Sequence, residues 1–442
     1  MPDIQANSAD EPPDAESASG RKPHIMVVGH HVGDNLFGAE RSLLDVLAAV
    51  DRGRFDLSCV LPSSNEAYLR AVAERTRDIT VFSYQWWSKE RPFDPEAVSR
   101  FATLFRSKGV DLLHVNTVTL MDPLVAARRL GLPAIVHARE LIDQDRELMP
   151  RFGEDADAIL KRIHAAADFV IANSDATHRL FYRREESFRL YNGIDVARFD
   201  VPNEVEPAGL KIGLVSSNGV KKGVDSFAHL AHMASLRRPE LEFYAIGPRT
   251  ERIERLEQQM RAWTGPANLR FPGYIADPLN AIRLVNVVLS LTRVPESFGR
   301  TIAEAMAARR PVIAYGWGAA PELIQHGQTG FLIPPFRLPE ALAHLERLAD
   351  NPELVAEMGR KGRERAQQLF SSEIFAAGLN AIYQRIMEIC KTRRGDQPGS
   401  GPRRFECLAA AHHVEDAQAV ISVSGHRDKP AVGADGHAVR EG

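Results

Sequence analysis

Short apolar runs alternate with longer amphipathic stretches along most of the chain. The first run, HIMVVG at residues 24–29, is continuously apolar, which is typical of a strand buried on both faces. After a polar loop, AERSLLDVLAAV at residues 39–50 has its apolar side chains at helical spacing, which predicts an amphipathic helix. The alternation continues to DFVIANS at residues 168–174. This order predicts a parallel sheet with helices on both faces.

A second series of the same kind follows DVPNEVEPAG, a linker-like segment at residues 200–209. It begins with LKIGLVS at residues 210–216, and a helical stretch at residues 371–390 closes it. We therefore expect an α/β protein with two Rossmann-like, doubly wound domains that face each other across a cleft. The expected parts are a disordered segment at 1–22, a first domain at 23–200, a linker at 201–209, a second domain at 210–372, a helix at 373–391 that packs back on the first domain, and a disordered tail at 392–442.

Composition narrows the classes of partner. The 442 residues carry 58 acidic and 55 basic side chains, a net charge of -3, so no general attraction to nucleic acid is expected. The 3 cysteines are too few and too scattered for a disulfide framework. The chain shows neither a signal peptide nor an apolar run long enough to cross a membrane. We expect a cytoplasmic protein whose membrane contact, if any, is peripheral and at the inner face.

The segment PESFGRTIAEA at residues 295–305 is the strongest candidate for a ligand site. Gly299 stands before a predicted helix, whose first N–H groups and dipole favour an anion such as phosphate. Glu296 and Glu304 would repel phosphate but accept hydrogen bonds from hydroxyl groups. A ligand with both phosphates and hydroxyls fits this pattern, although an acidic helix start needs no ligand.

Three further loops carry candidate chemistry. In SSNGVKKGVD, residues 216–225, Lys221 and Lys222 could neutralise a phosphate without a metal, or could be a solvated pair. Gly38 opens the first helix, where a plain glycine turn is the alternative. In PAIVHARELID, residues 133–143, Arg139 and Glu140 follow a strand; His137 is either a cleft residue or a buried one.

Three smaller features carry further candidate residues. Trp86 and Trp87 lie in a loop, where their rings could stack on sugars, touch lipid headgroups or pack beneath the loop. Asp155 and Asp157 have a spacing seen in metal sites, but they begin a helical stretch and fit surface acids better, so no metal is expected. His114 and Asn116 stand at a strand end, where polar cleft groups are expected.

Taken together, these motifs resemble the retaining nucleotide-sugar glycosyltransferases of family 4, which have the GT-B fold. The two glutamates of ESFGRTIAE have the family's spacing, with seven residues between them. The resemblance covers about His24 to Cys390 and includes GAERSLLDVL, NGIDVARF, KKGVD and GAAPELIQHGQTGFLIPP.

The resemblance implies that residues 23–200 form the acceptor-side domain and residues 210–372 the nucleotide-sugar-binding domain, and it implies a role for each motif. Glu304 would bind the ribose hydroxyls and Glu296 the hydroxyls of the transferred sugar. The N–H groups of Ser297, Phe298 and Gly299 would meet the diphosphate, together with Gly38, Lys221 and Lys222. Glu296, Lys222, Arg139 and His137 are the expected catalytic residues.

The chain departs from the family pattern at two places. The family usually has an Arg where this chain has Ser217, and a His-Asp or His-Thr pair where it has Arg139-Glu140.

The resemblance also implies an activity: a metal-independent, hexosyltransferase-type enzyme that moves a sugar from a UDP-, GDP- or ADP-sugar to a hydroxyl of a glycan, polysaccharide or lipid-linked acceptor, with retention. No other cofactor is expected. A nucleotide-sugar epimerase and a degenerate binding or scaffold subunit are the alternatives, the second because of the two departures.

Overall fold

The computed structural model describes residues 21–30, 36–63, 65–145, 148–206, 209–261 and 268–395, which belong to one compact unit. The expected disordered ends lie almost entirely outside these residues. The described part begins at Arg21, whose guanidinium binds the Asp111 carboxylate at 2.8 Å, and ends in helix α15 (Ser372–Gly395), which continues past residue 391. None of the helices within these ranges combines the length and the apolar character that crossing a membrane requires.

The first half of the chain forms a seven-stranded sheet in the order β3-β2-β1-β4-β5-β6-β7, with all strand pairs parallel. Helices α3, α4 and α6 pack on one face and α1 and α2 on the other, so the strands are apolar on both sides. The strands are β1 (His24–Val28), β2 (Asp56–Leu61), β3 (Asp78–Val81), β4 (Leu112–Val115), β5 (Ala134–Ala138), β6 (Phe169–Ala172) and β7 (Ser187–Arg189). The helices are α1 (Gly38–Ala49), α2 (Glu66–Ala73), α3 (Pro95–Lys108), α4 (Asp122–Leu130), α5 (Met149–Phe152), α6 (Ala156–Ala166) and α7 (Asp175–Leu180).

The second half forms a six-stranded parallel sheet in the order β10-β9-β8-β11-β12-β13. Helices α8, α9 and α13 cover one face, and α10 and α11 cover the other. The strands are β8 (Lys211–Val215), β9 (Glu242–Ile246), β10 (Leu269–Gly273), β11 (Val287–Ser290), β12 (Val312–Tyr315) and β13 (Gly330–Ile333). The helices are α8 (Val224–Ser235), α9 (Glu251–Met260), α10 (Pro278–Arg283), α11 (Arg300–Ala307), α12 (Ala320–Leu323), α13 (Leu338–Ala349) and α14 (Pro352–Phe370). Two doubly wound, Rossmann-like sheets confirm the expected fold class.

The strand order reverses at β1 in the first sheet and at β8 in the second. β1 lies between β2 and β4, and β8 lies between β9 and β11. The loops that leave two such neighbouring strands turn to opposite faces of the sheet, which opens a crevice at the carboxyl edge where ligands bind. The sheet order therefore directs attention to the loops after β1, β4, β8 and β11.

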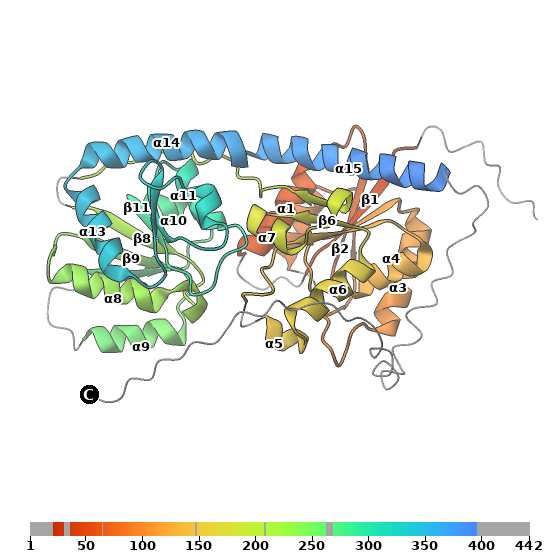
Figure 1. The fold of residues 1–442 in the computed structure, drawn as a ribbon, viewed down its shortest axis with the longest axis horizontal. Helices are drawn as coiled ribbons and strands as arrows, with labels where there is room; N and C mark the ends of the chain where they lie inside the picture. The colour runs from red at the N-terminus through yellow and green to blue at the C-terminus, as the bar shows by residue number, and fades with distance from the viewer. Residues whose placement is uncertain are drawn as a thin grey trace, which may run out of the picture. The chain divides into compact units, whose positions relative to one another are not determined.

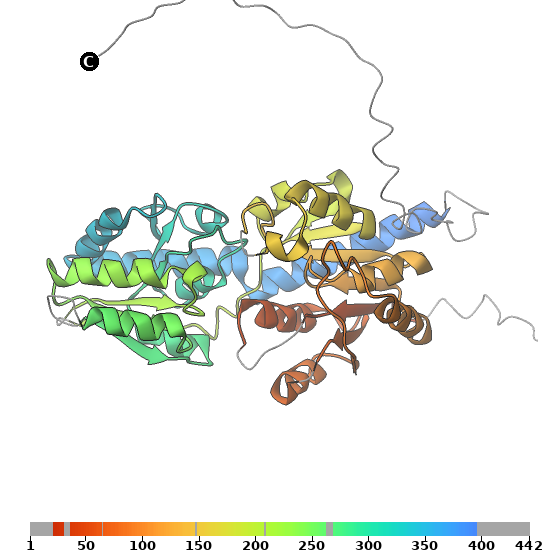
Figure 2. The ribbon, with the colours of Figure 1, turned by 90° about the horizontal axis from the view of Figure 1, so that it is seen from below.

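The last two helices carry the chain from the second sheet back to the first. Figures 1 and 2 both place α14 beside elements of the second sheet and α15 beside elements of the first. Phe375, Leu379 and Tyr383 of α15 lie in one buried cluster with Ile25 and Val27 of β1. The apolar face of α15 therefore completes the core of the first sheet.

The chain passes between the two sheets twice, near Ile194 and near Ser371, and hydrogen bonds join the two passages. The Ile194 N–H donates to the Phe370 carbonyl at 2.7 Å, and the Ser372 N–H donates to the Ile194 carbonyl at 3.0 Å. Gly193 permits the close approach, because a Cβ there would lie 2.9 Å from the Phe375 Cβ.

Tyr383→Phe tests the docking of α15. The Tyr383 hydroxyl bonds His114 Nδ1 at 2.6 Å, and both side chains are fully buried. The change leaves a buried ring nitrogen without its partner, so we expect the free energy of unfolding to fall by about 1–3 kcal/mol in urea denaturation. Arg385→Gln, on the exposed side of α15, should change it by less than about 0.5 kcal/mol. Equal effects of the two changes would contradict the buried bond.

Candidate active site

One cavity of about 740 Å³ is lined by loops that follow β1, β4 and β5 in the first sheet and β8 and β11 in the second. These loops include those at both strand-order reversals. Most residues that the sequence singled out line it: Gly38, Arg139, Lys221, Lys222, Glu296, Ser297, Phe298, Gly299 and Glu304. Ser217 and Glu140, the two departures from the family pattern, line it too.

The loop before α11 is held to the first sheet. Gly299 has a φ of 85°, a left-handed conformation that suits glycine, and α11 begins at the next residue. The Ser297 hydroxyl donates to the Arg139 carbonyl at 2.5 Å and accepts from Asn173 Nδ2 at 3.1 Å. Phe298 is buried against Tyr191. The start of α11 is thus fixed at the cavity wall.

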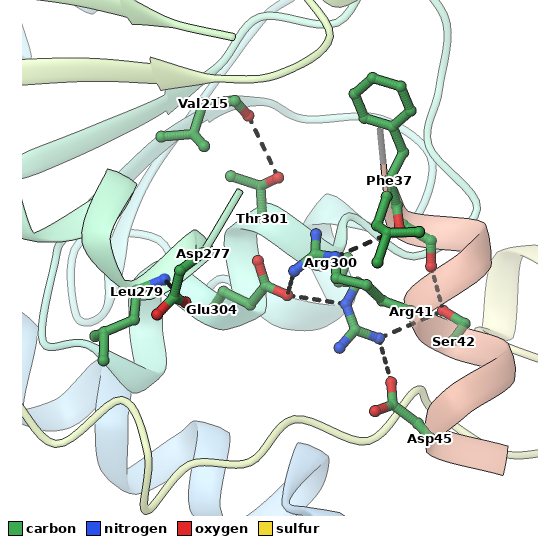
Figure 3. A network of polar contacts seen from close by, with 12 residues as sticks. Phe37, Arg41, Ser42, Asp45, Val215, Asp277, Leu279, Arg300, Thr301 and Glu304 are labelled. Atoms are coloured by element: carbon green, nitrogen blue, oxygen red, sulfur yellow. Dashed lines mark hydrogen bonds and ion pairs between the residues drawn. The ribbon is translucent and has the colours of Figure 1, made fainter. Parts of the chain in front are cut away.

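Glu304 lies at the centre of an ion network that joins α1 to α11 (Figure 3). Its Oε1 accepts from the Arg41 guanidinium at 2.6 Å and from Arg300 Nε at 2.8 Å. Arg300 also binds the Asp45 carboxylate at 2.5 Å. Burial opposes the charge of Arg300, but the carboxylates of Asp45 and Glu304 outweigh burial and raise its pKa. The network links the two halves of the molecule through four charged side chains.

Each lysine of the basic loop has a carboxylate partner. Lys222 Nζ lies 2.6 Å from Glu296 Oε1, and Lys221 binds the Asp145 carboxylate, which follows β5 in the first half. Gly223, with a φ of 77°, ends the loop close to the Leu291 carbonyl. The loop is therefore packed against the segment that follows β11.

Arg139 is the centre of a polar cluster at the ends of β4 and β5. Its Nε and one terminal nitrogen donate to Asn116 Oδ1 at 3.1 and 2.9 Å, and the other terminal nitrogen donates to Asn192 Oδ1 at 2.5 Å. Burial, the largest cause, lowers the pKa of Arg139 to about 10. Burial also raises the pKa of Glu140, whose Oε1 accepts from the Thr117 hydroxyl at 2.6 Å.

His137 lies beneath this cluster and does not line the cavity. Its ring is fully buried, its Nδ1 is 3.2 Å from both His114 Nε2 and an Arg139 nitrogen, and burial with the Arg139 charge lowers its pKa far below the ordinary value. The ring therefore packs against Arg139 behind the cavity wall, and its expected catalytic role stays a prediction. The alternation of side chains along the strand could not show whether His137 lies on the cavity side of Arg139 or behind it.

Sequence reasoning missed Arg41, Asp45, Arg300 and Asp145. The available signals were weak: Arg41 lies one helical turn from Gly38, and Arg300 directly follows Gly299. Asp155 has a structural role, because its Oδ1 accepts from the Ala158 N–H at 2.8 Å and caps α6.

Comparison with known proteins connects this geometry to a family. A family model described as "Glycosyltransferase Family 4" matches residues 38–198, and one described as "Glycosyl transferases group 1" matches residues 202–365. Together they cover most of the chain.

Two curated relatives are similar over much of their length. Alpha-D-kanosaminyltransferase of Streptomyces kanamyceticus is 25% identical over 60% of this chain and 73% of its own. N-acetyl-alpha-D-glucosaminyl L-malate synthase of Bacillus anthracis is 24% identical over 70% of this chain and 84% of its own. Among solved structures, Anabaena HepE in complex with UDP and glucose has a TM-score of 0.67 at 22% identity, over 83% of this chain and 99% of HepE. The last comparison establishes the fold.

Gly223→Ala tests whether the basic loop needs its glycine. A Cβ at Gly223 would lie 1.8 Å from the Leu291 carbonyl oxygen, at a left-handed φ, so the loop has to move. We expect the free energy of unfolding to fall by about 2 kcal/mol or more. Gly219→Ala is the matched control: its nearest contact is 3.8 Å away and its φ is -79°, so the change should stay within about 1 kcal/mol. Chemical denaturation measures both, and similar losses would show that the Leu291 contact is unimportant.

Proposed function

The chain belongs to glycosyltransferase family 4, with the GT-B fold, and from this premise we propose how its cavity carries out sugar transfer. The enzyme moves a sugar from a nucleoside-diphosphate sugar to a hydroxyl acceptor, and the family implies retention at the anomeric carbon. The observation that carries the proposal is the meeting of Glu296, Lys222 and the glycine start of α11 in one cavity.

We assign the nucleoside to Glu304. Arg41 and Arg300 both bind Oε1, so within the described residues Oε2 is the oxygen that is left to accept ribose hydroxyls. An ionised carboxylate is an acceptor on both oxygens, which suits a pair of neighbouring hydroxyl groups. The two arginines also hold the side chain in place.

We assign the diphosphate to the basic loop and to the backbone before α11. Its negative charge would replace Glu296 as the partner of Lys222 and Asp145 as the partner of Lys221. The N–H groups of residues 297–299 add neutral donors close to the same place. Two cations and fixed dipoles can stabilise the leaving diphosphate, so we propose transfer that needs no metal ion.

We assign the transferred sugar to Glu296 and Arg139. Once diphosphate binds Lys222, the Glu296 carboxylate is released to accept hydrogen bonds from sugar hydroxyls. Arg139 faces the cavity and is fixed by Asn116, Asn192 and His137, which makes it a rigid donor to substrate oxygen atoms. The departing phosphate takes the proton of the acceptor hydroxyl.

The identity of the donor nucleotide and the association with a membrane are more specific inferences. HepE is described in complexes with UDP and UDP-glucose, which makes UDP and its sugars the first ligands to test. A peripheral position at a membrane stays a prediction from the sequence.

Glu304→Gln and Glu296→Gln separate the two ends of the donor. Loss of a charged acceptor costs about 1.5–3 kcal/mol, or roughly tenfold to a hundredfold in affinity. Glu304→Gln should therefore weaken UDP binding on that scale in calorimetry. Glu296→Gln should leave UDP binding nearly unchanged and lower the rate of donor hydrolysis or transfer.

Arg41→Gln is the control for the ion network. It removes the contact with Glu304 but not the ribose acceptor, so UDP binding should be equal to that of the unchanged protein or tighter. If Arg41→Gln weakens UDP as much as Glu304→Gln does, Glu304 acts only through the network and the ribose assignment is wrong.

Activity should persist in excess chelator, because lysines and backbone N–H groups supply the positive charge at the diphosphate. The measurement is the rate of donor hydrolysis with and without EDTA after dialysis. Complete loss that Mg²⁺ restores would refute metal-independent transfer.

A further inference from the structure

The two neighbouring tryptophans have different surroundings. Trp87 is 3% exposed, donates from Nε1 to the Val118 carbonyl at 2.9 Å and stacks on Phe152 with ring centroids 4.3 Å apart. Trp86 is 41% exposed and lines the cavity. The buried ring anchors the loop, and the anchored loop presents the other ring to the cavity. A flat apolar ring fixed in this way is a surface on which a sugar ring can stack.

Arg151 lies beside the exposed ring. Its guanidinium carbon is 5.4 Å from the Trp86 centroid, and both side chains line the cavity. A guanidinium that lies over a ring still has N–H donors directed outward, in the geometry that suits a carboxylate or a phosphate.

Arg151 differs from the other charged side chains that line the cavity. Within the described ranges each of the others has a carboxylate, amide, hydroxyl or guanidinium partner, whereas Arg151 contacts the Trp86 ring and no acid. The partnered side chains are Arg41, Lys221, Lys222, Arg300 and Arg139 among the cations and Asp145, Glu140, Glu296 and Glu304 among the acids. Arg151 is exposed, so its guanidinium is accessible to an anionic ligand group.

The floor next to this ring is polar. The backbone N–H of Trp87 donates to the Thr119 carbonyl at 3.1 Å. This bond holds the tryptophan loop beside Thr117 and Glu140. Asn116 is 1% exposed and lines the cavity, and its Nδ2 has no partner within the described residues. A buried donor without a partner is costly unless a ligand binds it, so this floor suits the hydroxyl groups of a polyol.

We propose that the acceptor is a polyhydroxylated ring that carries a phosphate or carboxylate, with its ring on Trp86 and its anionic group on Arg151. This inference rests on the proposed sugar transfer. The residues assigned to the donor's nucleoside and diphosphate come from the second half of the chain, whereas Trp86, Arg151 and Asn116 come from the first. The proposed acceptor site therefore lies on the wall opposite the residues that bind the donor's nucleoside and diphosphate. Asp145, in the segment that precedes Arg151, lies beside Lys221 of the diphosphate loop in this structure.

Matched pairs of ligands test the charge requirement. With UDP saturating, calorimetry compares glucose with glucose 6-phosphate, methyl glucoside with glucuronic acid, and myo-inositol with myo-inositol 1-phosphate. At least one anionic member should bind about tenfold tighter than its neutral partner, the gain expected for a charge-assisted hydrogen bond. A second arm measures sedimentation with phosphatidylcholine vesicles that contain or lack phosphatidylinositol, which distinguishes a lipid headgroup from a free ligand.

Arg151 variants assign the effect to this side chain. Arg151→Gln should remove the preference for the anion, and Arg151→Lys should keep part of it. Arg100→Gln is the matched control, because the Arg100 guanidinium also lies 5.4 Å from a ring centroid, that of Phe82, but outside the cavity. It should leave the preference unchanged.

The outcomes separate this inference from the proposed function. If UDP binds and responds to Glu304→Gln, the donor site stands, whatever the acceptor result. Three results would overturn the anionic acceptor alone. They are equal binding of the charged and neutral ligands, no binding of any anionic ligand in either arm, and a preference for the anion that survives Arg151→Gln. A vesicle response that depends on Arg151 supports the proposal with a lipid headgroup as the source.

Discussion

A buried charge has to be neutralised, and the carboxylate of Glu304 imposes this constraint on the whole molecule. The side chain is 1% exposed, so leaving it ionised without a partner would be very costly. Its partners come from two helices in different halves of the chain, Arg41 on α1 and Arg300 on α11. Asp45 in turn pairs with Arg300. The bond from Arg41 to Glu304 thus holds α1 and α11 close together, and that proximity places the first-sheet loops opposite the second-sheet loops around one cavity.

The cavity wall contains the positive and negative charges that a donor would meet. Lys222 and Lys221 each hold a carboxylate, so neither charge is left uncompensated before a ligand arrives. In the proposed binding mode a diphosphate exchanges one anionic partner of each lysine for another, and Glu296 and Asp145 are released. Each lysine is then paired both with and without the ligand, at the cost of freeing the two carboxylates.

Local patterns in the sequence account for the fold and for much of the cavity wall. Parallel strands all end at one edge, so motifs that follow strands, such as the lysines after β8 and ESFG after β11, must gather there. What the sequence could not supply was pairing between distant segments: Arg41 and Glu304 are 263 positions apart, and nothing local to either predicts the other. The burial of His137 beneath Arg139 could not be predicted either. Strand periodicity distinguishes the two faces of a sheet, but it does not show how deeply a side chain near the edge is buried.

The paired passages at Ile194 and Phe370–Ser372 restrict how the two halves can move. A single connecting segment would allow rotation about several axes, whereas two segments joined side by side by hydrogen bonds favour rotation about one axis near Gly193. In such a rotation the residues far from the axis move most, so the width of the cavity is the dimension that a relative rotation of the two halves would change.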